Sequence, residues 1–114
     1  MKKYTEERPW GKFEQFTHNE ISTVKIITVN AGQKLSLQYH QHREEFWRFL
    51  DNPAKVTVGD KVIDVKKDSE VKIPKGAKHR VEALSQPVRF LEIAFGNFDE
   101  NDNIRLEDDY GRVK

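Results

Sequence analysis

The residues best suited to chemistry in this sequence are histidines that occur close to acidic residues. His40 and His42 are two positions apart in a predicted strand, so both side chains are expected on one face. Glu45 follows three residues later, and a turn could bring its carboxylate to the same point. His79 follows the segment 74–78, Pro-Lys-Gly-Ala-Lys, where a turn leads into a new strand. Three imidazoles and one carboxylate would hold one divalent ion such as Zn²⁺, Mn²⁺, Fe²⁺, Co²⁺ or Ni²⁺.

This pattern is informative because it combines several residues at a specific spacing. A lone histidine on a strand is more often a surface or packing residue, and a His-x-His pair alone is weak evidence. Glu45 and the Pro-x-Gly-x-x-His element make the spacing specific. The sequence has no cysteine, so any metal must be held by His, Asp, Glu or other oxygen donors. With six ligands around the ion, two positions would stay open for water or substrate oxygens.

The elements that must position these residues are strands almost throughout. Residues 22–29 form a β-branched run, and Gly59-Asp60 between two apolar runs predicts a two-residue hairpin. No segment shows helical periodicity over three turns. The predicted strands cover residues 22–29, 34–42, 45–50, 55–58, 61–65, 70–73, 79–83 and 88–95. Many short strands separated by Gly and Pro predict an all-β sandwich or closed barrel.

Length and charge exclude several functions. The 114 residues fit one domain, residues 1–114, and the polar stretch at 99–114, taken alone, could be a frayed tail. Lys and Arg number 20 against 19 Asp and Glu, so we expect neither a nucleic-acid nor a membrane partner. No apolar run follows the N-terminal lysines, and none approaches the roughly 18 residues of a membrane span. The expected location is cytoplasmic.

The two histidine segments resemble the two motifs of the cupin superfamily, G-x5-HxH-x3,4-E-x6-G and G-x5-PxG-x2-H-x3-N. The residues that carry the resemblance are Gly32, His40, His42, Glu45, Pro74, Gly76 and His79. The resemblance implies a small double-stranded β-helix, which is a jelly-roll-type barrel. It also implies that His40, His42, Glu45 and His79 are the ligands of one divalent metal ion.

The match to the first motif departs from the general pattern. Only two residues separate His42 from Glu45, one fewer than usual. Glu44 is therefore a competing ligand, and Glu45 is preferred because six residues then separate it from Asn52. Asn52 and Asp68 stand where motif glycines would be, and these residue types tolerate turn conformations best after Gly.

Three further segments are similar to the cupin domain of type II phosphomannose isomerases: residues 8–11 (Arg-Pro-Trp-Gly), 35–38 and 107–112. The resemblance extends from residue 8 to residue 112. In that family the domain often follows a mannose-1-phosphate guanylyltransferase, for which 114 residues leave no room. The resemblance implies interconversion of mannose 6-phosphate and fructose 6-phosphate. Trp10 is expected to be structural, filling the core beside an N-terminal strand.

Isomerisation moves a proton between C2 and C1 through an enediol, so it requires a Lewis acid, a base and cations for the phosphate. Glu92 is the candidate base, because it stands in an apolar run, where burying a carboxylate is costly unless it has a function. The alternative is an edge strand with Glu92 facing solvent. Gln38 shares the expected face of the first ligand, and Arg112, Lys34 and Arg43 are candidates for binding the phosphate.

Two other functions are compatible with the same ligands. One is a different cupin enzyme, such as a dioxygenase that uses Fe²⁺, which a wholly apolar cavity would favour. The other is a non-catalytic module that binds a sugar or metal, or acts with a guanylyltransferase. A phosphate-binding arginine in the cavity would favour the isomerase, and the absence of a free acid or base would favour the module. A homodimer formed by strand exchange is expected from the family.

Overall fold

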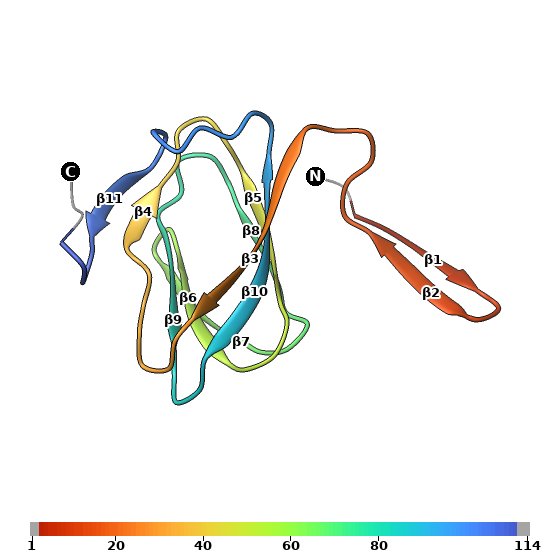
Figure 1. Cartoon of the computed structure of the whole chain (residues 1–114), viewed down its shortest axis with the longest axis horizontal. Coiled ribbons are helices and arrows are strands. Elements are labelled where there is room, and N and C mark those ends of the chain that lie inside the picture. The colour runs from red at the N-terminus through yellow and green to blue at the C-terminus, as the bar shows by residue number, and fades with distance from the viewer. Residues whose placement is uncertain (1–2, 112–114) are drawn as a thin grey trace.

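The computed structural model describes residues 3–111, and within that range the chain forms strands and no helix (Figure 1). The strands are β1 (Tyr4–Arg8), β2 (Gly11–Gln15), β3 (Ser22–Val29), β4 (Leu37–Tyr39), β5 (Glu45–Phe49), β6 (Ala54–Val58), β7 (Lys61–Val65), β8 (Glu70–Ile73), β9 (His79–Ala83), β10 (Val88–Phe95) and β11 (Ile104–Glu107). The prediction of an all-β fold is confirmed. Residues 3–111 contain no helix long and apolar enough to cross a membrane.

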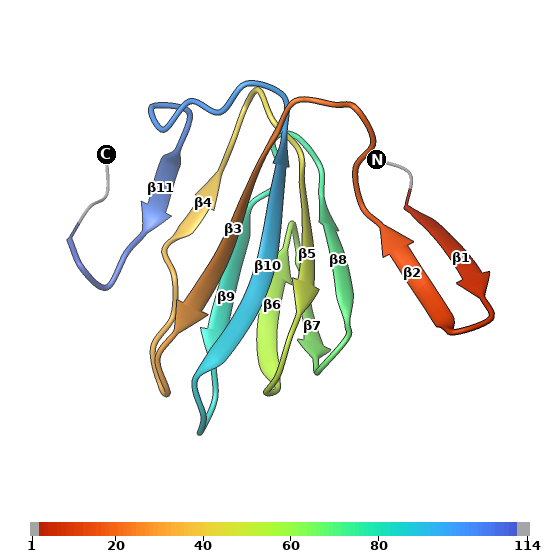
Figure 2. The ribbon, with the colours of Figure 1, turned by 45° about the vertical axis from the view of Figure 1, so that its right-hand side comes forward.

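Two antiparallel sheets form the body of the molecule. One has the strand order β3-β10-β5-β8 and the other the order β11-β4-β9-β6-β7. In Figure 2 the first sheet lies in front of the second. Trp47, Phe49 and Phe90 fill the space between them, with ring centroids of Phe49 and Phe90 5.2 Å apart. Burial of these large aromatic faces, together with the aliphatic residues around them, stabilises the barrel.

The turns behave largely as their residue types require. Val58 pairs with Lys61, so Gly59 and Asp60 form the predicted two-residue hairpin between β6 and β7. Gly59 has a φ of 60°, a conformation that costs a glycine little. Asp68, which replaces a motif glycine, also adopts a positive φ of 72°. An aspartate tolerates this conformation better than most side chains.

Strand β4 is shorter than the run predicted over residues 34–42. The backbone amides of Gln41 and His42 donate to the carboxylate of Asp102, at 2.9 and 2.8 Å. Amides engaged in this way do not continue a strand ladder, and the chain bends out of the sheet. His40 and His42 therefore do not share one face of a strand, and that prediction is wrong.

The first two strands form a separate hairpin that extends away from the barrel (Figure 1). Trp10, at the turn of this hairpin, is 73% exposed, so the expectation that it fills the core is wrong. Arg48 of β5 connects the hairpin to the barrel, because its guanidinium donates to Glu14 at 3.1 Å and to Glu70 at 2.9 Å. Lys3 joins the same two carboxylates. These contacts explain an arginine in an otherwise apolar strand.

Candidate metal site and adjoining cavity

Three of the four predicted ligands come together at one end of the barrel. The side chains of His40, Glu45 and His79 offer ligand atoms that all lie within 4.8 Å of one another. His40 follows β4, Glu45 begins β5 and His79 begins β9, so both sheets contribute. The three residues are 4%, 3% and 1% exposed. This group, called the His/Glu/His group below, could hold a metal ion.

The hydrogen bonds of the two imidazoles prepare them as ligands. His40 Nδ1 lies 2.7 Å from the carbonyl oxygen of Asp102, and His79 Nδ1 lies 2.9 Å from that of Ala77. A carbonyl oxygen only accepts, so each Nδ1 carries the proton and each Nε2 presents a lone pair. The Nε2 atom of His79 is buried and has no hydrogen-bond partner among residues 3–111. A hydrogen bond from Nδ1 to a carbonyl oxygen is typical of histidines that bind a metal through Nε2.

Burial keeps both imidazoles neutral. It lowers the pKa of His79 to about 4, against a usual value of 6.5. Burial is also the main cause of the lowered pKa of His40, although the nearby carboxylate of Glu45 opposes it. A metal ligand must be the neutral imidazole, so the donor set fits a divalent ion at neutral pH.

Arg43 places its guanidinium directly against this group. Its Nε atom donates to Glu45 Oε2 at 3.0 Å, and its Nη2 atom lies 3.3 Å from His40 Nε2. The other carboxylate oxygen of Glu45 accepts from Trp47 Nε1 at 3.0 Å. A bound cation would share Glu45 Oε2 and His40 Nε2 with Arg43, or displace the guanidinium from them.

His42, the remaining predicted ligand, is not brought into the His/Glu/His group. Its side chain is exposed, and its backbone amide belongs to the loop held by Asp102. Of the two glutamates that competed as ligand, Glu44 is exposed, whereas Glu45 is buried and reaches the group.

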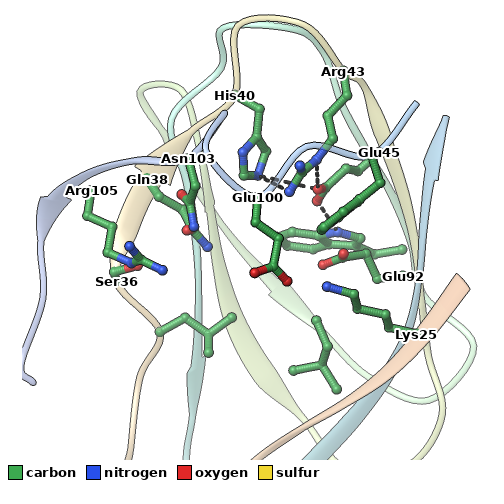
Figure 3. Close-up of a pocket in the computed structure, with 14 residues that line it drawn as sticks. Lys25, Ser36, Gln38, His40, Arg43, Glu45, Glu92, Glu100, Asn103 and Arg105 are labelled. Carbon is green, nitrogen blue, oxygen red and sulfur yellow. Dashed lines mark hydrogen bonds and ion pairs between the residues drawn. The ribbon is translucent and has the colours of Figure 1, made fainter. Parts of the chain in front are cut away.

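A cavity of about 320 Å³ opens beside the His/Glu/His group (Figure 3). Its wall combines polar and charged side chains with a few apolar ones, drawn from both sheets and from the loop before β11. The lining residues are Lys25, Ile27, Leu35, Ser36, Gln38, His40, Arg43, Glu45, Trp47, Glu92, Phe98, Glu100, Asn103 and Arg105. This composition suits a polar ligand with several oxygen atoms better than an apolar one.

The structure places only some of the predicted substrate-binding residues at the cavity. Gln38 and Arg43 line the cavity. Lys34 does not line it, and its ammonium lies 4.0 Å from the Asp109 carboxylate on the exterior. Arg112 lies outside the described residues.

Glu92, the predicted base, also lines the cavity. Its strand β10 runs between β3 and β5, so the alternative of an edge strand is wrong. The residue is 8% exposed, and no described residue forms a hydrogen bond with its carboxylate. Burial, followed by the negative charge of Glu45, raises the pKa of Glu92 to about 7. A carboxyl group of this kind exchanges a proton readily at neutral pH.

Sequence reasoning missed the part of the cavity that precedes and includes β11. Asn103 and Arg105 line the cavity, and β11 pairs with β4, although the polar composition of this stretch, taken alone, was compatible with a frayed tail. The available signal was the alternation Ile104-Arg105-Leu106-Glu107, which is typical of a strand with two unlike faces. The role of Phe98 was also not predicted: the cationic groups of Lys25 and Arg43 both lie over its ring.

The fold and the site define a double-stranded β-helix protein with a histidine and glutamate group that could hold a metal ion. The chain belongs to the mannose-6-phosphate isomerase C-terminal family, whose model matches residues 2–108. Mannose-1-phosphate guanylyltransferase ManC from Salmonella typhimurium is 39% identical over 108 residues. That match covers 93% of this chain but 22% of the Salmonella protein.

Solved structures agree with the fold. A structure of Bacillus subtilis oxalate decarboxylase, an enzyme with Mn(II) centres, gives a TM-score of 0.69 at 20% identity, covering 76% of this chain and 24% of that one. A protein with a double-stranded β-helix domain from Klebsiella pneumoniae gives a TM-score of 0.62 at 20% identity, covering 68% and 69%. The predicted double-stranded β-helix is therefore confirmed.

Proposed function

We propose that this domain is a metal-dependent isomerase that interconverts mannose 6-phosphate and fructose 6-phosphate. The observation that carries the proposal is the position of Glu92, a buried carboxyl group in the cavity beside the His/Glu/His group. A carboxyl group is costly to bury without a partner, and its pKa near 7 suits a base at neutral pH. Membership of the mannose-6-phosphate isomerase C-terminal family supports the same activity.

The residues divide the reaction between them. His40, Glu45 and His79 would hold one divalent ion, which would supply Lewis-acid stabilisation to the carbonyl and adjacent hydroxyl oxygens of the sugar. The carboxylate of Glu92 takes the proton from C2 of the open-chain aldose and returns it to C1, with an enediol between the two transfers. The hydroxyl proton passes from O2 to O1, so the product is the ketose. The amide of Gln38 lines the cavity and can hydrogen-bond a sugar hydroxyl.

The polar wall of the cavity argues against the dioxygenase alternative, for which a wholly apolar cavity was expected. A second candidate function is a non-catalytic module that acts with a mannose-1-phosphate guanylyltransferase. The Salmonella guanylyltransferase supports this candidate, because the segment similar to this chain makes up 22% of that longer protein. In that role the cavity would bind a sugar phosphate without turning it over.

The two candidates differ in turnover. Protein purified without a His-tag or chelator, then loaded with one divalent ion at a time, would be assayed for fructose 6-phosphate formed from mannose 6-phosphate. We expect activity in the wild type and in His42→Ala, and its loss in Glu92→Gln and His40→Ala. Bound metal and sugar phosphate without turnover, for all ions tried, would overturn the isomerase proposal and leave the module. Activity retained in Glu92→Gln would remove Glu92 as the base.

A further inference from the structure

The cavity has a second polar end, away from the His/Glu/His group, formed by the last described strand. Arg105 of β11 pairs with Gln38 of β4, and Gln38 pairs with His79 of β9. Directly paired residues of antiparallel strands place their side chains on the same face of the sheet. Arg105, Gln38 and His79 therefore form one row across three neighbouring strands.

This row fixes the distance between the two ends. Neighbouring strands lie about 4.8 Å apart, so the backbone at Arg105 is roughly 10 Å from the backbone at His79. A hexose phosphate has its carbonyl carbon and its phosphorus at opposite ends of an open chain of comparable length. Figure 3 shows Arg105 on one side of the cavity and Glu45 on the other, with Asn103 and His40 between them.

Arg105 differs from the other arginines near the site. Arg43 donates to the Glu45 carboxylate and the Asp99 carbonyl oxygen, and Arg80 donates to the Leu35 carbonyl oxygen. No residue among 3–111 accepts a hydrogen bond from Arg105, although its Nε atom is buried. A buried donor without an acceptor is unfavourable, so a guanidinium in this state is suited to receive an anionic ligand.

Asn103 adds a second unpaired polar group next to Arg105. Its Oδ1 atom is buried and has no hydrogen-bond partner among the described residues. The amide nitrogen of the same side chain can donate to an anion while Oδ1 accepts from a hydroxyl group. Two unpaired polar side chains from one short segment therefore line the same end of the cavity.

We propose that Arg105, with Asn103 beside it, binds the phosphate group of a sugar phosphate whose carbonyl end lies at the His/Glu/His group. This inference rests on the proposed function and adds the residues that select a phosphorylated sugar. The planar guanidinium matches two phosphate oxygens at once. The carboxyl groups of Glu45 and Glu92 lie on the far side of the cavity from Arg105, and the carboxylate of Glu100 lies between them and Arg105 (Figure 3).

The test measures binding, which does not depend on turnover. Inorganic phosphate, mannose 6-phosphate and unphosphorylated mannose would each be titrated into the full chain by isothermal calorimetry. The variants are Arg105→Ala, Arg105→Lys and Asn103→Asp. Arg89→Ala is the matched control, because Arg89 is exposed on β10 and lies outside the cavity. Circular dichroism would establish that each variant is folded.

We expect wild type and Arg89→Ala to bind mannose 6-phosphate equally, and Arg105→Ala to bind it at least tenfold more weakly. Arg105→Lys keeps the positive charge but loses the planar guanidinium, so its affinity for mannose 6-phosphate is expected to lie between those of wild type and Arg105→Ala. Asn103→Asp is expected to bind inorganic phosphate more weakly than wild type. Unchanged affinity for mannose 6-phosphate in folded Arg105→Ala would overturn the inference, as would equal binding of mannose and mannose 6-phosphate by the wild type. An inactive protein that shows the expected binding would uphold the phosphate site while the isomerase proposal fails.

Discussion

Arg43 and Glu45 form a buried ion pair, with Nε 3.0 Å from Oε2, on the carboxylate that also belongs to the His/Glu/His group. Both side chains are almost fully buried, so each charge depends on the other for compensation. A bound divalent ion would supply a second source of positive charge at Glu45. The guanidinium and the ion are therefore expected to compete for the same oxygen.

This competition predicts opposite effects of Arg43→Met on stability and on metal affinity. Without metal, the variant leaves Glu45 buried and unpaired, and we expect a loss of about 3 kcal/mol in the free energy of unfolding. With metal, the competing cation is gone, so the affinity is expected to rise. Denaturant unfolding with and without a divalent ion measures both effects. A variant with unchanged metal affinity would show that Arg43 and the ion do not share Glu45.

The two neighbouring histidines are predicted to differ sharply in metal binding. His40→Ala removes a buried ligand atom, whereas His42→Ala alters an exposed side chain outside the group. We expect His40→Ala to weaken binding by more than the roughly 10–100-fold that loss of an outer-shell contact causes. His42→Ala is expected to bind one ion per chain, the same number that we expect for the wild type. Metal analysis after dialysis compares them, and equal losses in both variants would restore His42 as a ligand.

Glu92 predicts a pH dependence of stability in the metal-free protein. Its pKa is about 7 in the folded state, against a usual value of 4.5. A raised pKa means that the folded state binds the proton more tightly, so the stabilisation is present below pH 4.5 and is lost as the pH rises through 7. The full change is on the order of 3 kcal/mol.

Comparison with Glu92→Gln isolates this contribution. His79, whose pKa is lowered to about 4, changes stability in the opposite direction over a similar range, and it is present in both proteins. The wild type is therefore expected to lose stability relative to Glu92→Gln between about pH 5 and pH 7. Urea unfolding at several pH values gives the difference. Parallel curves for the two proteins would mean that Glu92 is not buried in its protonated form.

The N-terminal hairpin is predicted to loosen without unfolding the barrel when Arg48 is replaced, because only Lys3 then joins Glu14 to Glu70. Arg48→Met removes the hydrogen bonds to Glu14 and Glu70, which are partly exposed, so we expect a global loss of no more than about 1 kcal/mol. Amide exchange in β1 and β2 is expected to become faster, while exchange in β10 stays slow. High salt should produce a weaker form of the same change in the wild type. Arg89→Ala serves as the exposed control, and uniform acceleration across all strands would contradict the prediction.

Local sequence patterns were sufficient for most of the fold. Alternating apolar residues predicted strands for β3 and for β5 to β10, because a strand places successive side chains on opposite faces. The spacing of Gly59-Asp60 predicted the hairpin that joins β6 and β7. Motif spacing also selected His40, Glu45 and His79, the three residues that the structure brings together. The roles of these residues as ligands stay predictions.

Tertiary contacts between distant segments decided the rest. His42 turns outward because Asp102, 60 residues away in the chain, takes its amide. Arg105 reaches the cavity only because β11 pairs with β4, and Arg48 has a role only because the hairpin brings Glu14 beside it. Sequence periodicity reports which face of an element is apolar, but it does not report which distant carboxylate or strand edge that element will meet. The residues that line the cavity were therefore settled by long-range pairing, whereas the strands that support it were determined locally.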